Sequence, residues 1–451
     1  MTATTKKDTP RPVAIELFCG AGGMALGFEQ AGFDVLAAVD HDPIHLAVHS
    51  FNFPFTTPIC ADVSAVTPET IAGSARKGWG ALGRQGEWNG EIDCLFGGPS
   101  CQGFSYIGKG DTKDSRNDLV RSFATLVAEL QPKTFVLENV PGLLSPKYSG
   151  RLQELLDRLS NAGYALVAGR PLLLDAADYG VPQARRRVFL VGAQQHLALP
   201  PLPVASAAGV TSLDALKGLP NADDWMYLLS QDVLRLTDVA LAAMEKSSSE
   251  YGKSLRTPFA NEYPRVWSRN ALAGCLRTVH TDEVRSRFAA LPPGGEDGPS
   301  RFRRLARSGT SFTLRAGTGR DHGSFTAPRP IHYRYPRVLT VREAARLHSL
   351  PDWYRLHVTK WHGHRQIGNA VPPRLAYAVA TSILDALDCG SLSPPTDARS
   401  LGDESLLALT LTEAAAHFDY DQALLPYDVR RRTNKPRRLK DPGDISFKGD
   451  A

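Results

Sequence analysis

Residues 13–23 decide the fold, and they read VAIELFCGAGG before the helical pattern MALGFEQAG at 24–32. The apolar run predicts a buried strand, and the glycines after it allow a tight turn into a helix. Such a turn lets the backbone approach a ligand closely and offers the free amide groups of a helix N-terminus. The spacing is not GxGxxG and no Lys-Ser or Lys-Thr follows, which disfavours dinucleotides and nucleoside triphosphates. We therefore expect another nucleotide-like cofactor at this turn.

Short apolar runs alternate with helical patterns as far as about residue 193. Each run is bounded by Gly, Pro or charged residues, as expected of buried strands, and apolar residues recur at three-to-four spacing between the runs. This alternation predicts an α/β fold with a doubly wound, mostly parallel sheet that carries helices on both faces. The expected strands are 13–18, 34–40, 92–98, 134–140 and 186–192, and the expected helices are 24–32, 118–131 and 151–163.

The alternation stops after residue 193. A Pro/Ala-rich stretch at 197–209 opens a segment to about residue 337 that is rich in Pro, Gly, Arg and aromatic residues, so we expect a second, smaller and irregular domain. Helical patterns return at 340–350 and 374–387. The second of these patterns needs an apolar partner, because its apolar residues fall every four positions, at Leu375, Val379, Ile383 and Leu387.

The composition is that of a globular protein. The chain has 451 residues, of which 42% are hydrophobic and 22% charged, enough for two or three domains. No stretch approaches the roughly 20 apolar residues that span a bilayer, and the N-terminus has no apolar signal run, so we expect neither a membrane protein nor a secreted one. The six cysteines form no CxxC pattern, which predicts neither disulfides nor a metal site and fits a reducing cytoplasm.

Positive charge is concentrated in one segment. Residues 265–346 contain 16 Arg, no Lys and 6 acidic residues, which gives +10, whereas the whole chain has a net charge of +5. A basic segment on a near-neutral body is typical of a protein that grips a polyanion with one part. The alternative is a solvated face in an arginine-rich protein, since Arg outnumbers Lys by 38 to 14.

Two acidic residues follow the strands next to the glycine turn. Asp40 ends the second strand about 20 residues after the glycines, where an acid typically accepts hydrogen bonds from ribose hydroxyls. Asp62 stands where a third strand should end, a place from which it can accept from an adenine amino group. Each acid alone is more often a cap or turn residue. In this order, however, they indicate a cofactor that contains adenosine.

A cysteine lies in the loop after the fourth strand, within GGPSCQGFS at 97–105. The glycines and the proline hold this loop at the carboxyl end of the sheet, where Cys101 is placed to act as a nucleophile, whereas Cys94 inside the strand fits a buried structural role. Glu138 ends the next strand and puts a carboxyl group beside the loop. The run QARRR at 183–187 adds guanidinium groups suited to phosphates or a base carbonyl. We therefore expect a nucleophile, an acid and an anion clamp at one edge of the sheet.

These motifs together resemble those of the cytosine-C5 DNA methyltransferase family. The resemblance covers roughly residues 13–192 and 338–388, and the last 60 or so residues have no counterpart. The family commonly has two prolines before its cysteine, and here the second position is Ser100, which concerns the stiffness of the loop. The matching segments occur in the family's order, as ELFCGAGGMALGFEQAGF (16–33), GGPSCQGFS (97–105), FVLENVPGLL (135–144), VPQARRRVFLVG (181–192), VLTVREAARLHSLPD (338–352) and RQIGNAVPP (365–373).

The resemblance implies a domain plan and a cofactor. Its fold is that of S-adenosylmethionine-dependent methyltransferases, in which residues 1–192 and 338–388 would form one catalytic domain. Residues 193–337 would then form the target recognition domain, and we expect 389–451 to be a partly disordered extension. The residues that resemble the family's S-adenosylmethionine pocket are Phe18, Gly20, Gly22, Asp40, Asp62, Pro99 and Asn369.

The resemblance also implies catalytic roles. Cys101 resembles the nucleophile, and Glu138 resembles the acid that contacts the N3 edge of the pyrimidine. Arg187, together with Arg185, resembles the anchor for the target nucleotide and its phosphate. The stretch 106–116, directly after the nucleophile, is the natural loop to close over a base flipped out of the duplex.

Sequence choice should then depend on the recognition segment. Thr313-Leu314 resembles the Thr-plus-aliphatic pair of such recognition domains, and Arg315 and Arg320 flank a Gly-rich loop beside it. An Arg that donates two hydrogen bonds to guanine discriminates between bases by about 1–3 kcal/mol. Most of the 16 arginines of residues 265–346 should nevertheless contact phosphates or solvent, because backbone contacts outnumber base contacts.

Two other functions share these features. An RNA C5-methyltransferase would use the same cysteine and glutamate, but the long recognition segment and the lack of an appended RNA-binding motif argue against it. An inactive DNA-binding regulator would have lost a catalytic residue, and none is lost here. We therefore predict a cytoplasmic DNA (cytosine-5)-methyltransferase that acts as a monomer on double-stranded DNA. It would protect host DNA against a cognate restriction endonuclease, which is a genetic rather than a physical partner; the alternative is a solitary enzyme without an endonuclease.

Overall fold

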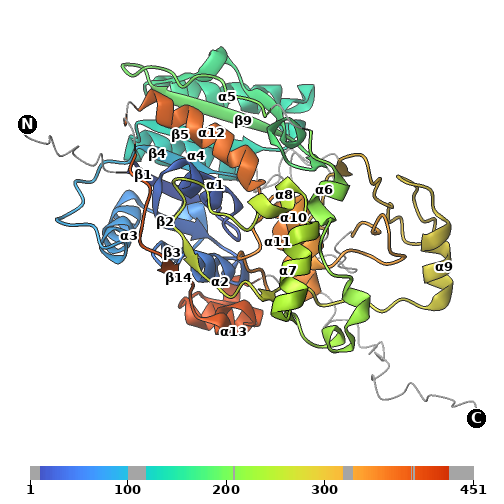
Figure 1. Ribbon diagram of the computed structural model, residues 1–451. Coiled ribbons are helices and arrows are strands. Elements are labelled where there is room, and N and C mark those ends of the chain that lie inside the picture. The colour runs from blue at the N-terminus through green and yellow to red at the C-terminus, as the bar shows by residue number, and fades with distance from the viewer. Residues whose placement is uncertain are drawn as a thin grey trace, which may run out of the picture.

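The computed structural model describes residues 11–99, 118–206, 209–317, 329–387, 389 and 392–425. Its central feature is an eight-stranded sheet with the order β3-β2-β1-β4-β5-β9-β6, in which β7 also pairs with β9 (Figure 1). The five strands expected from the apolar runs are all present. The strands of this sheet are β1 (Val13–Leu17), β2 (Asp34–Asp40), β3 (Thr57–Cys60), β4 (Cys94–Gly97), β5 (Thr134–Asn139), β6 (Tyr164–Leu166), β7 (Leu172–Asp175) and β9 (Arg186–Gln194).

The direction of the strands fixes where a ligand can bind. β1 to β5 run parallel to their neighbours, whereas β9 runs antiparallel to β5, β6 and β7. The chain order turns outward in both directions from β1 and β4, so this pair is the topological switch point of the sheet. Ligands of open α/β sheets bind beyond the carboxyl ends of the strands at such a point. The predicted α/β class with a mostly parallel, doubly wound sheet is confirmed.

Helices connect the parallel strands on both faces. The right-handed crossover rule places the helices after β1 and β2 on one face and those after β3 and β4 on the other. No helix in the described ranges is long and apolar enough to cross a lipid bilayer. The helices that follow β1 to β5 are α1 (Gly23–Ala31), α2 (Pro43–Asn52), α3 (Pro68–Ala81), α4 (Asp118–Leu130) and α5 (Ser149–Asn161).

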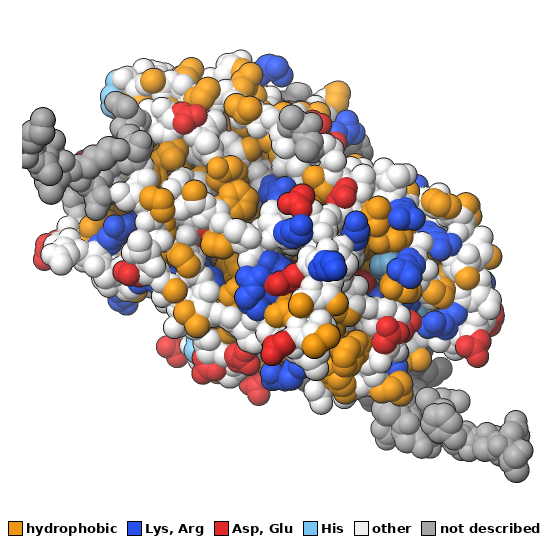
Figure 2. All heavy atoms as spheres, viewed as in Figure 1, with side chains coloured by type: hydrophobic (Ala, Val, Ile, Leu, Met, Phe, Trp, Pro, Cys, Tyr) orange, Lys and Arg blue, Asp and Glu red, His pale blue; other side chains and the backbone are white. Residues whose placement is uncertain are grey.

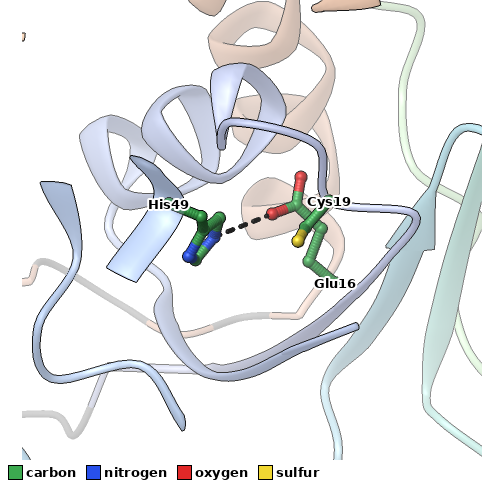
Figure 3. Close-up of side chains that lie close together, drawn as sticks. All are labelled: Glu16, Cys19 and His49. Carbon is green, nitrogen blue, oxygen red and sulfur yellow. Dashed lines mark ion pairs between the residues drawn. The ribbon is translucent and has the colours of Figure 1, made fainter. Parts of the chain in front are cut away.

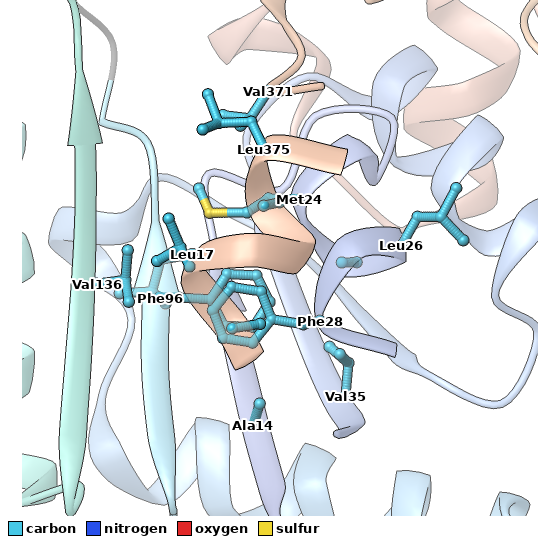
Figure 4. Packing of buried hydrophobic residues seen from close by; sticks show 14 of the residues in the cluster. Ala14, Leu17, Met24, Leu26, Phe28, Val35, Phe96, Val136, Val371 and Leu375 are labelled. Atoms are coloured by element: carbon cyan, nitrogen blue, oxygen red, sulfur yellow. The ribbon is translucent and has the colours of Figure 1, made fainter. Parts of the chain in front are cut away.

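The late helix α12 (Pro373–Ala386) packs on α1, although more than 340 residues separate their first residues. Contact is close because Gly27 has no side chain: a Cβ there would lie 2.5 Å from the Cβ of Ala376. Below the two helices, Phe28 stacks on Phe96 of β4 with ring centroids 3.8 Å apart (Figure 4). The apolar stripe of α12 thus finds its partner on α1, and the C-terminal part of the chain completes the core of the sheet.

Most of the described residues among 209–317 and 329–337 form the lobe on the right of Figure 1. It has short elements around two small apolar clusters, one with Leu228 and one with Phe288 at its centre. Two of its strands pair outside the lobe: β13 with β8 (Gln183–Ala184) and β11 with β14 (Arg399–Ser400). The lobe contains α6 (Ser212–Leu216), β10 (Leu234–Arg235), α7 (Asp238–Ser247), α8 (Glu250–Ser254), β11 (Arg265–Val266), β12 (Ala271–Leu272), α9 (Asp282–Ala290) and β13 (Ser311–Phe312).

Two short helices lead from this lobe back to α12. α10 (Val341–Leu347) begins with a capping box in which Thr340 and Glu343 satisfy each other's backbone amides, and α11 (Lys360–Asn369) ends just before α12. Both lie where the helical pattern at 340–350 and the motif RQIGNAVPP predicted ordered structure.

Residues 392–425 are the described part of the C-terminal extension, and they are folded. They form β14, the short helix η9 (Glu404–Leu407) and α13 (Leu411–His417), and the last two pack on α2. Leu407, Ala414 and Ala415 are fully buried. These residues are thus an ordered part of the extension that was expected to be partly disordered, because scattered apolar side chains without a long periodic run still find a complementary surface.

Candidate functional site

The candidate site lies at the carboxyl ends of β1, β2, β4 and β5. Phe18 follows β1 and Asp40 is the last residue of β2. Gly97 is the last residue of β4, with Gly98 and Pro99 after it, and Glu138 is the last but one residue of β5. Because these strands are parallel neighbours, their ends meet at one edge of the sheet. The topology therefore brings together the residues that the sequence placed in one site.

The glycine turn after β1 is held open by backbone conformations that favour glycine. Gly20 and Gly22 have φ of +54° and +93°, and Phe18 also lies in the left-handed region at +56°. The Gly20 amide donates to a carboxylate oxygen of Asp40 at 2.8 Å, and the Asp42 amide donates to the other oxygen at 2.8 Å. No atom lies within 4 Å of a Cβ built on Gly20, so the turn borders open space. Asp40 thus first shapes the turn, and its remaining lone pairs can face a ligand.

The other expected cofactor residues surround this turn at different depths. Asp62 is exposed, and its carboxylate accepts from the amide and hydroxyl of Ser64. Asn369 is exposed at the end of α11, and the residues after it press on the turn, since a Cβ on Gly23 would lie 2.7 Å from the Val371 carbonyl oxygen. Pro99 is buried, and its carbonyl accepts from the Asn139 side chain at 3.3 Å.

A buried group that the sequence did not indicate supports the turn from below. Glu16, Cys19 and His49 lie together (Figure 3), with 3.4 Å between a Glu16 oxygen and His49 Nε2. Burial raises the pKa of Glu16 and of Cys19 well above their ordinary values and lowers that of His49 to about 4. The Cys19 thiol and the His49 imidazole are therefore uncharged at pH 7, and the Glu16 carboxyl group holds a proton more readily than an ordinary glutamate. The other Glu16 oxygen accepts from the Ala25 amide at 3.2 Å and so caps α1.

Glu138 and Arg187 form an ion pair beside the loop that leads to Cys101. Arg187 Nε lies 2.8 Å from a Glu138 oxygen, and each side chain is 12% exposed. Burial raises the pKa of Glu138 although the charges of Arg187 and Arg185 oppose this effect. A Cβ on Gly98 would lie 2.8 Å from the other Glu138 oxygen, so a larger residue there would displace the carboxyl group. The site therefore offers a mostly buried carboxyl group that holds a proton more readily than the carboxyl group of an ordinary glutamate.

Arg185 does not have the role expected from the sequence. It is 1% exposed, and its guanidinium donates to the carbonyls of Leu314, Gly368 and Ala370, each at 2.8 Å. The expectation that it anchors a nucleotide or phosphate is wrong in this structure, because its donors are directed into the protein. Arg185 instead ties the 313–317 segment to the end of α11.

The expected recognition residues divide in the same way. Leu314 is 4% exposed, and its amide donates to the Gln183 side chain at 3.0 Å, so the expected contact of Leu314 with DNA is corrected to a role in packing. Thr313 donates to the Ala184 carbonyl at 2.7 Å, and Arg315 is exposed. Gln183, which the sequence analysis gave no separate role, also donates to the Leu347 carbonyl at 3.2 Å.

Four of the positions expected to take part in function, Ser100, Cys101, the loop 106–116 and Arg320, lie outside the described residues. The residues on each side of the first gap are described, and they place the start of the Cys101 loop against Glu138 and Asn139. The roles of these four positions stay predictions.

Many arginines of residues 265–346 pair inside the protein rather than facing solvent. Arg337 is bidentate to Glu343, with both distances 2.8 Å, and Arg346 is bidentate to Asp352 at 2.9 and 2.7 Å. Arg265 reaches Glu29 of α1 at 2.8 Å. The expectation that most of these arginines contact phosphate or solvent is therefore too broad, and some of their counter-charges lie outside the segment. Among the described residues of this segment, the exposed arginines are Arg269, Arg301, Arg303, Arg307, Arg315 and Arg334. Lys and Arg side chains are spread over the right-hand lobe in Figure 2.

Comparison with known proteins extends across the whole of this architecture. Residues 13–385 match the model of the C-5 cytosine-specific DNA methylase family. The type II methyltransferase M.XorII of Xanthomonas oryzae pv. oryzae is 46% identical over 420 residues, which are 92% of this chain and 94% of that protein. The type II methyltransferase M.AgeI of Thalassovita gelatinovora is 31% identical, with 83% of this chain and 99% of that protein covered.

A solved structure agrees with these matches. A crystal structure described as an E. coli DNA modification methyltransferase encoded within a prophage is 34% identical to the chain, with a TM-score of 0.66. It covers 84% of this chain and 99% of its own.

Proposed function

The chain belongs to the C-5 cytosine-specific DNA methylase family, and from this premise we propose that it methylates cytosine within one specific duplex sequence as the modification enzyme of a restriction-modification system. It is a DNA (cytosine-5)-methyltransferase, with S-adenosylmethionine as its methyl donor. The observation that carries the site assignment is the Glu138–Arg187 pair, which lies beside Gly98 at the same sheet edge as the glycine turn.

The residues around the turn fit S-adenosylmethionine. The open space at Gly20, the Asp40 carboxylate behind it and the exposed Asn369 at its rim suit a flat, adenosine-bearing ligand with hydroxyl donors. Phe18, Asp62 and Pro99 complete the proposed pocket. When bound, the cofactor supplies a methyl group on a positively charged sulfur, and a carbon atom can accept this methyl group only if its electron density is high enough.

Cytosine C5 becomes such a nucleophile only after a thiolate adds to the ring. We assign this addition to Cys101: a bond forms between its sulfur and C6, and the C5–C6 double bond supplies electron density to C5. Glu138 donates or shares a proton at N3, where negative charge develops, and its raised pKa suits this task. After C5 is methylated, loss of the C5 proton returns its electron pair to the ring and expels the Cys101 thiolate.

Arg187 has two roles in this proposal. It holds Glu138 in place through the 2.8 Å contact, and its remaining donors can reach the flipped base or its phosphate. The target nucleotide must leave the base stack to reach the site, which costs a few kcal/mol. We assign recognition of the flanking sequence to residues 193–337, in which Arg315 is exposed close to the site.

The biological setting follows from the relatives. M.XorII and M.AgeI are type II methyltransferases, and such enzymes protect host DNA from a cognate endonuclease. We propose the same setting here, with the enzyme acting in the cytoplasm as a monomer on DNA and the endonuclease as a genetic partner. Residues 1–192 and 338–388 would act as the catalytic domain.

The test is bisulfite sequencing of DNA from cells that express the chain. The wild-type protein should protect cytosine from conversion within one sequence context, and Cys101→Ala should protect none. Cys94→Ala is the matched control, because Cys94 is fully buried in β4 and burial raises the pKa of its thiol to about 12. If bisulfite converted every cytosine in DNA from cells that express the wild-type protein, the proposed function would be contradicted.

A second experiment tests the covalent step. A duplex with 5-fluorocytosine at the target should form an adduct with the wild-type protein that survives denaturing electrophoresis and requires S-adenosylmethionine, because fluorine cannot leave as a proton does. A complex that dissociates on denaturation would argue against addition of Cys101.

A further inference from the structure

Residues 392–425, which lie beyond the family's motifs, are anchored to the cofactor side of the sheet. The Gly402 amide donates to the Phe51 carbonyl at 2.8 Å, and the Val358 amide donates to the Leu407 carbonyl at 3.0 Å. A Cβ on Gly402 would lie 2.9 Å from Phe51 Cα, so the two backbones touch. Phe51 belongs to α2, the helix that begins three residues after Asp40. In Figure 1, α13 accordingly lies beside α2 at the lower edge of the molecule.

The two aromatic residues that follow α13, Phe418 and Tyr420, lie on the side of the glycine turn. Asp419 has a φ of +52°, and the Tyr420 amide donates back to the Ala415 carbonyl at 2.9 Å, so the chain reverses there. Phe418 packs in one apolar cluster with Cys19, Cys60, Ala38 and Leu46. Cys19 lies inside the glycine turn and Cys60 ends β3, so Phe418 contacts the underside of the pocket walls.

Tyr420 lies next to the acidic residues of the same pocket. Its ring is half-buried, and burial together with the charges of Cys60, Asp62, Asp40 and Asp42 raises the pKa of its phenol. The phenol therefore keeps its proton and can donate a hydrogen bond to a neighbouring acceptor. An aromatic ring with a donor group, held at the ends of β2 and β3, matches what an adenosine offers: a flat face and several acceptors.

The outer surface of the segment excludes nucleic acid as its partner. Asp403, Glu404, Glu413, Asp419 and Asp421 are all exposed on it. Acidic side chains gather along the lower edge of the molecule in Figure 2, where α13 lies in Figure 1. A polyanion would be repelled from this surface, so we do not expect the segment to contact DNA.

We propose that residues 418–420 form the outer wall of the cofactor pocket and that Tyr420 contacts the adenosine part of S-adenosylmethionine. This inference rests on the proposed function, because it takes the pocket between Phe18 and Asp62 as the cofactor site. Cofactor affinity would then depend on a segment that the family's own motifs do not include.

The test measures equilibrium binding of S-adenosylhomocysteine and of adenosine to the full-length protein without DNA, by calorimetry. Tyr420→Ala should weaken both ligands by about tenfold or more, the scale of a lost base–aromatic stack, and Tyr420→Phe should retain most of the affinity. Tyr227→Ala is the control, since Tyr227 is a half-buried tyrosine in the separate cluster around Leu228. Affinity of Tyr420→Ala equal to that of the wild type would overturn the inference and leave the proposed function intact.

A measurement on the wild type covers the case in which Tyr420→Ala does not fold. Hydrogen exchange of residues 411–420 should slow when S-adenosylhomocysteine is added, because the ligand closes against them. Exchange that is unchanged at saturating ligand would overturn the inference. If the wild-type protein binds no S-adenosylhomocysteine at all, the assignment of the pocket itself fails, and the inference fails with it.

Discussion

The carboxyl edge of the sheet and the segment 265–346 both concentrate charged side chains, but they direct them differently. At the edge, Glu138 and Arg187 keep 12% of their surface exposed and face the space beside Gly98. In the segment, Arg337 and Arg346 are at most 1% exposed, and each is bidentate to a buried carboxylate. The net charge of a segment therefore shows where arginine is abundant, and only the exposure of each side chain shows which of these arginines can contact DNA.

The chemistry of the guanidinium group explains this difference. Its planar set of five donors can satisfy several carbonyls at once, so an arginine can bind distant segments together without another polar partner. Arg342 does so with the carbonyls of Ala273, Pro351 and Tyr354, at 2.8 to 3.0 Å. An irregular lobe with few ladder hydrogen bonds gains most from such links. If the carboxyl edge serves catalysis and the segment 265–346 serves folding, substitutions in the two regions should have different effects.

The largest expected effect is on catalysis. Glu138→Gln removes the acid and should lower the rate of methyl transfer by about 10²- to 10⁴-fold, the usual contribution of a positioned general acid. The unfolding midpoint and the affinity for S-adenosylhomocysteine should stay close to wild type. Single-turnover transfer of labelled methyl to a duplex measures the rate, with the exposed Glu129→Gln as the control. A rate within threefold of wild type would remove Glu138 from the mechanism.

The next effect is on stability in the arginine-rich region. Asp352 is 1% exposed among Arg346, Arg256 and Arg342, and although burial opposes ionisation, these charges lower the pKa of its carboxyl group. Asp352→Asn should reduce the free energy of unfolding by about 3–5 kcal/mol, because it leaves buried guanidinium groups without a counter-charge. Urea denaturation measures this loss. Glu404→Gln should cost less than about 1 kcal/mol, because Glu404 is exposed in its pair with the half-buried Arg355.

Acid should weaken the same region through Glu343. Burial alone would raise the pKa of this carboxyl group, but the charge and hydrogen bonds of Arg337 outweigh it and lower the pKa to about 2. A lowered pKa stabilises the folded state above the unfolded value near 4.5, and this contribution is lost as pH falls from there toward 2. The stability difference between wild type and Glu343→Gln should therefore shrink by about 1.4 kcal/mol per pH unit in that window. A difference that stays constant between pH 5 and pH 3 would contradict the assigned pairing.

A smaller effect is expected from crowding the site. The Cβ of Gly98→Ala would lie 2.8 Å from a Glu138 oxygen and should displace the carboxyl group, lowering the methyl-transfer rate by about tenfold without loss of cofactor affinity. Gly150→Ala is the control, because no atom lies within 4 Å of a Cβ there. Equal rates for the two variants would mean that the position of Glu138 is not critical.

The smallest effect concerns Arg315, which is exposed and follows Leu314, whose carbonyl accepts from Arg185. Arg315→Ala should lower duplex affinity by less than about tenfold and reduce the salt dependence of binding by about one counterion, as expected for one lost phosphate contact. Arg269→Ala should leave that dependence unchanged, because Arg269 is engaged with Glu245 at 2.6 Å. A shift in preference between the cognate and a one-base-altered duplex would instead identify Arg315 as a base contact, worth about 1–3 kcal/mol.

The sequence alone determined five strands of the sheet, three of the helices that pack on it and the residues at its carboxyl edge. Apolar periodicity is a local signal, and parallel strands end at one edge, so the motifs around Phe18, Asp40 and Glu138 converge without further information. The partner of α12 could also be expected to exist from its apolar stripe, although its identity could not. The role of Cys101, which lies outside the described residues, still rests on the motif alone.

Only the tertiary structure decided which of several similar residues face the site. Arg185 and Arg187 are two positions apart in one motif, yet Arg185 is turned inward by carbonyls of Gly368 and Ala370, more than 180 residues away. Leu314 became part of the core, and residues 392–425 docked beside the cofactor turn, through contacts that are also distant in the chain. Burial is a property of the assembled surface, and no local pattern encodes which distant backbone groups a side chain will meet.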